Sequence, residues 1–343
     1  MRFRLDRFTL LLLGAIVLAS FLPVRGQAAE VMSSVGTLAV ALLFFLHGAA
    51  LSRQQIVEGA THWRLHIVIT ALTFVFFPLA VLPVNGLQHL TPGWMPADLG
   101  LGFLYLGVLP SAVSSSIAYT ALAKGNVPAA ICSAAASNVF GMMLTPFLLM
   151  LLVSTAGTGD FAVLDALQSI ILQLLLPFAV GHALRPWLGG VLARNESLTS
   201  RYDQCVIWLI VYTAFSHSVV SGLWEKLPWS AVVFTIVLCF GLLGLFMLVA
   251  SLIVRKLGFS LEDEAAVVFC GSKKSLASGL PMAQVLFAGH PGFGMIVLPI
   301  MCYNQIQVIV GAMLAQRYRM KIEQKNADSE GVQGGAQSSV ERS

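Results

Sequence analysis

Long apolar segments alternate with short polar ones along almost the whole chain. Most of these segments have about 20 residues or more, the length that an α-helix needs to cross the hydrocarbon core of a bilayer. They lie at residues 8–22, 32–51, 65–86, 99–122, 127–153, 162–186, 205–222, 229–255, 265–288 and 293–316. The pattern predicts an all-α polytopic membrane protein with ten transmembrane helices.

The positive residues between these segments predict the orientation. If the N-terminus is cytoplasmic, almost all lysines and arginines fall in cytoplasmic segments, and only Arg25 and Lys226 fall in loops on the other side. Such a bias is typical of membrane proteins and places both termini in the cytoplasm. We therefore expect a multi-pass plasma membrane protein, in a bacterium an inner-membrane protein. The first segment, which follows Arg2 and Arg4, also resembles a signal peptide. We favour a retained helix because the following chain is itself membrane-spanning, and cleavage stays open.

Composition supports a membrane protein and argues against other classes. Of the 343 residues, 57% are hydrophobic and 10% are charged, and the mean hydropathy is +0.83, whereas about 25% of residues in soluble domains are charged. The net charge of +4 is scattered rather than gathered in a patch, so nucleic acid is not an expected partner. The five cysteines lie in apolar segments or at their edges and suggest neither a disulfide framework nor a metal site. No paired intramembrane carboxylates and no phosphate-binding glycine loop are present, so we expect no enzyme, no nucleotide and no cofactor.

Two halves of the sequence resemble each other weakly. The second segment of each half contains FLHG (45–48) or FSHS (215–218), and the fourth contains a stretch rich in Gly, Pro and Ser at 110–116 or 271–281. Paired interruptions of this kind indicate a transporter binding site between inverted repeats. We expect a membrane domain at 1–319, with repeat one at about 1–155 and repeat two at about 160–319. Residues 320–343 are polar and are expected to form a disordered cytoplasmic tail.

The second interruption carries two adjacent lysines, Lys273 and Lys274. A charge at bilayer depth costs about 3 kcal/mol on insertion scales, so it persists where it has a partner or a task. The lysines are open to three interpretations: direct work on an anion or a proton, a structural substitute for a bound cation, or a side chain that extends to the membrane surface. The acidic residues all lie in termini, loops or helix ends, so no carboxylate reaches the middle of a predicted span.

Several motifs resemble the bile acid/sodium symporter superfamily, in its divergent symporter-like branch. They are GVLP (107–110), SSS (114–116), LAKGNV (122–127), LTP (144–146) and FCGSKKSLASG (269–279). The resemblance covers nearly the whole chain up to the tail. It implies ten helices in two inverted five-helix repeats, a panel domain from helices 1, 2, 6 and 7, and a core domain whose helices 4 and 9 unwind and cross near the membrane centre.

The chain departs from that family at the sodium site. The resemblance places a serine-asparagine pair of helix 4 on Ser115 and Ser116, an acidic residue of helix 9 near Cys270, and a glutamine near Lys274. Sodium prefers oxygen ligands, and a lysine side chain supplies none. The coupling ion is therefore expected to be a proton, or sodium if the resemblance is followed literally.

These observations predict a secondary transporter that moves a small organic anion across the bilayer by alternating access, with a non-transporting regulatory protein or sensor on the same fold as the alternative. Asn304, Gln305 and Gln307 serve either helix packing or ligand binding, and His47 and His217 either packing or proton relay. The candidate substrate- or ion-binding residues are Ser114, Ser115, Ser116, Ser133, Ser137, Asn138, Ser272, Lys273, Lys274, Ser275, Asn304 and Gln305.

Overall fold

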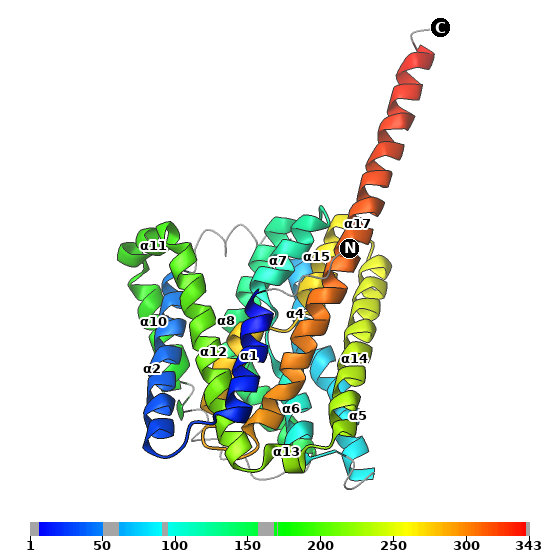
Figure 1. The fold of residues 1–343 in the computed structure, drawn as a ribbon. Helices are drawn as coiled ribbons and strands as arrows, with labels where there is room; N and C mark the ends of the chain where they lie inside the picture. The colour runs from blue at the N-terminus through cyan, green and yellow to red at the C-terminus, as the bar shows by residue number, and fades with distance from the viewer. Residues whose placement is uncertain (1–6, 51–61, 91–94, 157–167, 170, 341–343) are drawn as a thin grey trace.

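A computed structural model describes residues 7–50, 62–90, 95–156, 168–169 and 171–340. The described residues are almost entirely helical (Figure 1). The first half contains α1 (Arg7–Phe21), α2 (Gln27–Ala50), α4 (Trp63–Ala71), η2 (Leu72–Phe76), α5 (Phe77–Leu90), α6 (Ala97–Val108), α7 (Val113–Leu122) and α8 (Val127–Ala156). The second half contains η3 (Ile171–Leu175), α10 (Leu176–Ala183), α11 (Arg185–Arg194), α12 (Glu196–Val220), α13 (Leu223–Lys226), α14 (Trp229–Lys256), α15 (Leu261–Ser272), α16 (Leu276–Leu286) and α17 (Phe293–Val340).

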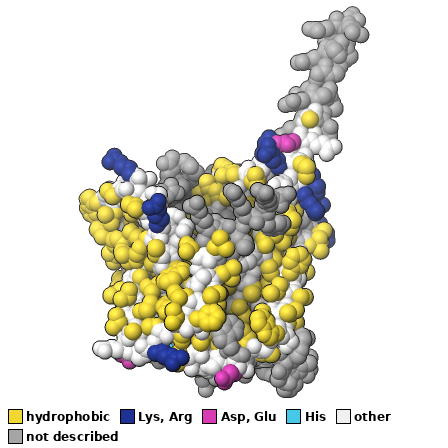
Figure 2. All heavy atoms as spheres, viewed as in Figure 1, with side chains coloured by type: hydrophobic (Ala, Val, Ile, Leu, Met, Phe, Trp, Pro, Cys, Tyr) yellow, Lys and Arg dark blue, Asp and Glu magenta, His cyan; other side chains and the backbone are white. Residues whose placement is uncertain are grey.

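Within the described residues, six helices are long and apolar enough to cross a membrane, and two bent helix pairs raise this number to eight. The pairs are α6 with α7, bent by 58°, and η3–α10 with α11, bent by 92°. Figure 2 shows hydrophobic side chains across the middle of the visible face and lysines and arginines mainly toward the upper end. The protein is therefore a multi-pass membrane protein whose apolar outer face fits a bilayer.

The contacts between helices divide the bundle into two groups. In one group α10 packs on α2, α2 on α12 and α12 on α1, with α11 beside α2. In the other, α6 packs against α5, α8 and α17, while α15 packs against α7, α14 and α8. Helix α12 also contacts α16 and α17, so it lies at the boundary between the groups (Figure 1).

Two glycines make the contact between α2 and α10 unusually close. A Cβ atom on Gly48 would collide with the carbonyl of Phe178, and a Cβ atom on Gly181 would collide with the carbonyl of Phe45. Because the glycines lack side chains, the two backbones touch directly, as at small-residue interfaces of other membrane helices.

The two interrupted helices run in opposite directions. Figure 1 shows α7 and α15 near the upper end of the bundle and α6 and α13 near the lower end. The chain therefore ascends through α6 and α7 and descends through α15 and α16. Helix α17 then rises through the bundle and projects beyond its upper end.

The structure differs from the sequence prediction at two places. The polar segment after residue 186, expected to be a loop, forms α11 and the first turns of α12. The tail expected to be disordered continues α17 as helix through Val340. Extending an existing helix carries no nucleation cost, so α17 can continue into this polar segment. The first residues of the segment still contact the bundle, since Ile322 is buried and Glu323 pairs with Lys124. The first part of the predicted span at 162–186 lies outside the described residues.

Candidate functional site

The two interruptions meet in the interior of the bundle. Helix α6 ends at Val108 and α7 begins at Val113, while α15 ends at Ser272 and α16 begins at Leu276. The backbone N–H of Ser275 donates a hydrogen bond to the carbonyl of Pro110 over 2.9 Å. We call residues 109–112 and 273–275 the crossover. The prediction that these two segments are broken helices is confirmed, although Ser114, Ser115 and Ser116 lie on the regular helix α7.

Local chemistry explains where the helices break. Pro110 has no N–H to continue α6, and Leu109 before it is extended, with ψ of 149°. In the other segment Lys273 is extended, with ψ of 141°. Ser275 then caps α16, because its side chain accepts a hydrogen bond from the N–H of Ser278.

Breaking a helix frees backbone carbonyls, and a carbonyl in the membrane interior needs a donor. Hydroxyl groups from neighbouring helices supply several of these donors. Ser111 donates to the Cys270 carbonyl (2.6 Å), Ser116 to Phe269 (3.0 Å), Tyr303 to Ser272 (2.6 Å) and Thr145 to Val108 (2.8 Å). The crossover is therefore held together largely by side-chain hydrogen bonds to its backbone.

The fully buried Lys274 supplies further donors. Its Nζ donates to the carbonyls of Leu109 (2.7 Å), Gly107 (2.9 Å) and Thr73 (3.1 Å). It also lies 4.0 Å from the centre of the Phe77 ring, a distance at which an ammonium is attracted to the ring face. We call the oxygens of Thr73, Gly107 and Leu109 the carbonyl cage.

The π-helix η2 explains why the Thr73 carbonyl is available. The N–H of Phe77 bonds to the carbonyl of Leu72, five residues before it, instead of to that of Thr73. The next residue, Pro78, has no N–H to offer. The Thr73 carbonyl thus loses both backbone donors that could have reached it, and the lysine replaces them.

Gln307 on α17 fixes the backbone of the same lysine. Its Oε1 accepts from the N–H of Lys274 and its Nε2 donates to the carbonyl of Lys274, both over 2.9 Å. Its Nε2 also donates to Asn304 Oδ1 over 3.0 Å. Of the α17 residues predicted for the site, Asn304 therefore reaches the crossover through Gln307, and Gln305 is half-buried on the same helix.

The side chain of Lys273 points to a different environment. Its Nζ lies 3.4 Å from the centre of the Tyr119 ring and 5.6 Å from that of Phe269. The amine is buried and has no hydrogen-bond partner among the described residues. A Cβ atom on Gly311 would lie 2.9 Å from this nitrogen, so the glycine makes room for it.

Two of the three predicted residues on α8 also reach the crossover. Asn138 Nδ2 donates to the Ser111 carbonyl over 2.9 Å, and its Oδ1 accepts from Ser278. Ser137 accepts from the N–H of Ser111 over 3.0 Å. Ser133 lies nearer the start of α8, and its Oγ is 2.6 Å from His66 Nδ1.

The remaining predicted residues are more scattered. Ser272 bonds to the Val268 carbonyl of its own helix. On α7, Ser115 is half-buried and Ser114 is exposed. Two residues that contact Lys274, Thr73 and Gln307, are not among the candidate residues predicted from the sequence. Gln307 has a sequence signal, a polar side chain in an apolar span, whereas Thr73 acts through its backbone and has no comparable signal.

One carboxylate is buried at the upper end of the bundle. Glu264, in the first turn of α15, is 2% exposed. It accepts from Arg255 Nη2 (2.9 Å), Tyr318 (2.8 Å) and Ser251. Burial alone raises the pKa of Glu264, but the hydrogen bonds from Arg255, Ser251 and Tyr318 outweigh it and hold the pKa below its ordinary value.

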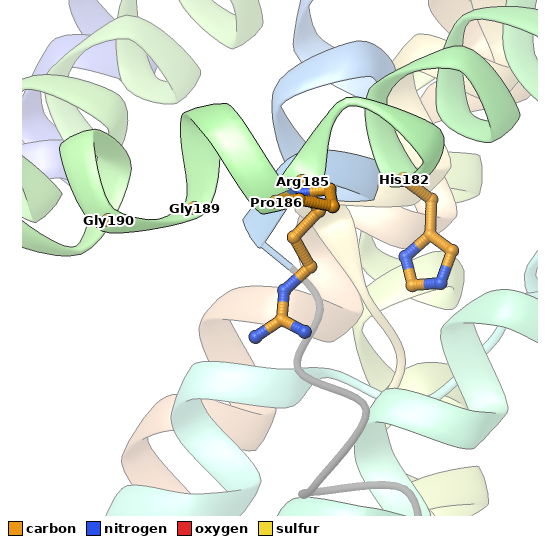
Figure 3. Close-up of a pocket in the computed structure, with 5 residues that line it drawn as sticks. All are labelled: His182, Arg185, Pro186, Gly189 and Gly190. Carbon is orange, nitrogen blue, oxygen red and sulfur yellow. The ribbon is translucent and has the colours of Figure 1, made fainter.

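Two pockets open at opposite ends of the bundle. A pocket of about 260 Å³ lies where α12 faces α16, and its lining includes Arg25, His217 and His290. A second of about 330 Å³ lies at the elbow between α10 and α11 (Figure 3). His182 and Arg185 project from one side of that elbow. Among the residues that the structure describes, no group of three or more His, Cys, Asp or Glu side chains is placed to hold a metal.

Comparison with known proteins identifies the family. The sequence model of the SBF-like CPA transporter family matches residues 6–320. The chain belongs to this family. Among its relatives, "Putative symporter YfeH" of Escherichia coli K12 is 46% identical over 330 residues, which cover 95% of this chain and 96% of that protein. "Sodium/bile acid cotransporter 7-B" of Xenopus laevis is 28% identical over 318 residues, 91% of each chain.

Similarity extends to mammals. "Sodium/bile acid cotransporter 7" of Mus musculus is 27% identical over 303 residues, 88% of each chain. The resemblance deduced from the sequence motifs is thus confirmed at the level of the family. Membership of the SBF-like family makes this a transporter-type membrane protein, and the relatives named here are transporters by name.

Proposed function

We propose that this SBF-like protein is a secondary transporter that moves a small organic anion by alternating access. The observation that carries the proposal is the crossover: two broken helices of opposite direction meet at their breaks, and the second break contains two buried lysines. Broken helices at the interface of repeats form the binding sites of several transporter folds. Two positive charges at that place favour an anionic substrate.

The proposed membrane arrangement has ten spans in two inverted repeats, with both termini cytoplasmic. Besides the eight long or bent candidates, α1 is a shorter apolar helix and α15 with α16 forms a broken helix that carries charges. The opposite directions of α6–α7 and α15–α16 support the inversion. In this arrangement the upper end of Figure 1 is cytoplasmic, in agreement with the lysines and arginines gathered there.

The two helix groups support a division into panel and core. The proposed panel contains α1, α2, α10 and α12, and the proposed core contains the crossover. The 260 Å³ pocket lies where α12 of the panel faces α16 of the core. Its Arg25, His217 and His290 make it a suitable outer opening for an anion. Residues 1–319 then form the transport domain, in a bacterial inner membrane.

Sodium, which occurs in the names of some relatives, does not fit the described crossover. Hard cations prefer several oxygen ligands. The carbonyl cage already binds the Lys274 ammonium, and Ser116 donates its hydrogen to Phe269. A sodium ion about 4 Å from that ammonium would meet roughly 4 kcal/mol of repulsion at an effective dielectric constant of about 20. We therefore propose coupling to a proton rather than to sodium.

Uptake into proteoliposomes would test the proposal. The purified protein would be reconstituted and screened with radiolabelled organic anions, including dicarboxylates and bile acids, under proton and sodium gradients. We expect uptake of at least one anion, driven by the proton gradient, and a several-fold lower rate in an Arg25→Gln variant. Lys226→Gln serves as the control, since it changes a charge in an outer loop outside the pocket lining.

Two outcomes would contradict the proposal. If a folded, reconstituted protein takes up no anion and no anion raises its Tm, the regulatory alternative is favoured. If uptake instead follows the sodium gradient alone, the transporter assignment stands and the coupling assignment is wrong.

A further inference from the structure

The geometry around Lys274 has the features of a cation site. Three backbone carbonyl oxygens from two different chain segments converge on one point, at 2.7, 2.9 and 3.1 Å from the lysine nitrogen. An ammonium has three N–H groups, and three carbonyls accept them. The face of Phe77 closes another side of the site.

Within the described part of the chain, the contacts of the Lys274 ammonium include no carboxylate that could neutralise this charge. The buried carboxylate described above, Glu264, bonds to Arg255, Ser251 and Tyr318 and lies in the first turn of α15, whereas Lys274 follows the end of that helix. The compensation comes from dipoles instead. Gly107 and Leu109 lie at the C-terminal end of α6, where the helix dipole is negative and attracts a positive charge.

We propose that Lys274 is a tethered cation. Its ammonium fills a carbonyl-lined site for a monovalent cation, so the wild-type protein binds no diffusible cation there and needs none to hold the crossover together. Removing the ammonium leaves the carbonyl cage intact and opens it to a small monovalent cation from solution.

The neighbouring lysine provides a matched control. Lys273 is adjacent in sequence, equally buried and also a lysine, but its nitrogen faces the Tyr119 ring instead of carbonyl oxygens. Its removal takes away the same charge without exposing an oxygen cage. An effect of cations that is confined to Lys274 variants therefore depends on the cage rather than on net charge.

Thermal unfolding of the purified protein in lipid nanodiscs tests the proposal. The wild type, Lys274→Ala, Lys274→Gln and Lys273→Ala would be compared in sodium, potassium, ethylammonium or N-methylglucamine chloride at equal ionic strength. We expect the wild type and Lys273→Ala to have the same Tm in all four salts. Lys274→Ala should have a lower Tm in N-methylglucamine, and sodium or ethylammonium should restore it saturably by about 5 °C.

Lys274→Gln keeps the test decisive if Lys274→Ala does not fold, because the glutamine amide fills part of the space and adds one oxygen ligand. It should respond to sodium in the same way. The proposal is overturned if the wild type itself shows saturable stabilisation by sodium. It is equally overturned if both variants fold without any cation response, or if neither folds even when purified with ethylammonium. None of these results depends on transport. The proposed function can therefore fail while this inference holds, and this inference can fail while the proposed function holds.

Discussion

Two buried charges in this protein are stabilised in different ways. Glu264 has an opposite charge beside it, since Arg255 Nη2 lies 2.9 Å from its Oε1 and the arginine side chain is 55% exposed. Lys274 is fully buried, and its ammonium contacts among the described residues are carbonyl oxygens and an aromatic ring. A charge near the membrane surface can use a partner that stays hydrated, whereas a charge at the crossover depends on fixed backbone dipoles. The second arrangement is the more sensitive to substitution.

The largest effect is expected for Lys274→Met. The substitution leaves three buried carbonyls without hydrogen-bond donors, and each lost donor costs about 1 to 3 kcal/mol of stability. Part of this loss is offset, because the variant no longer has to desolvate an ammonium on folding. We expect the free energy of unfolding to fall by about 3 kcal/mol, measured by steric trapping or denaturant unfolding in a fixed detergent. Lys273→Met, which removes an amine without a hydrogen-bond partner among the described residues, should change it by less than about 1 kcal/mol. Equal losses in the two variants would contradict the distinction between the lysines.

A smaller effect is expected at the carboxylate. Glu264→Gln keeps the shape but weakens charge-assisted hydrogen bonds from Arg255 and leaves donors poorly paired. The free energy of unfolding should fall by about 2 kcal/mol. Glu262→Gln is the control, because Glu262 is partly exposed and lies 3.9 Å from Lys325. A loss at Glu262 as large as that at Glu264 would show that general surface charge, rather than the buried contacts, is responsible.

The carboxylate also predicts a pH dependence. The pKa of Glu264 in the folded protein lies below its ordinary value of 4.5, so its ionised form stabilises the fold above that value. This stabilisation is lost as the pH falls through the pKa of the folded state. We expect the Tm of the wild type to decrease more steeply between pH 5 and about pH 3 than that of Glu264→Gln. Parallel Tm curves for the two proteins would contradict this assignment.

The smallest effect is expected for an exposed pair. Lys124 Nζ lies 2.8 Å from Glu323 Oε1, but the two side chains are 52% and 42% exposed. Surface pairs of this kind add little and are screened by salt. Lys124→Gln should change the Tm by about 1 °C or less, and the change should vanish in 1 M salt. A larger, salt-independent change would mean that the turn after α7 needs the lysine for another reason.

Sequence reasoning located the two broken helices because the signal is local. Pro110, the serines after it and the glycines around Lys273 weaken helices wherever they stand. The same reasoning could not separate the roles of the two lysines. Adjacent residues differ in their surroundings only once the chain is folded, and the acceptor at Thr73 arises from a π-helix two hundred residues away.

For the polar residues of α8 and α17, the sequence likewise predicts that partners exist but not which partners they are. Their positions in apolar spans predicted that Asn138 and Asn304 would find partners, and both do. Which residues contact Lys274 directly depends on how α17 is rotated, and that rotation brings Gln307 rather than Gln305 to its backbone. The serines of α7 divide in the same way, since only one face of a helix can meet the crossover. Ser116 therefore bonds to Phe269, while Ser114 is exposed.

The contact between α2 and α10 has a mechanical consequence. Gly48 and Gly181 each meet the backbone of the other helix, so neither helix can slide past the other without a carbonyl striking a Cα position. We expect the two helices to move together as one rigid body during any rearrangement, with the motion occurring where this pair meets its neighbouring helices. Replacing Gly48 or Gly181 with alanine would push α2 and α10 apart and displace both helices.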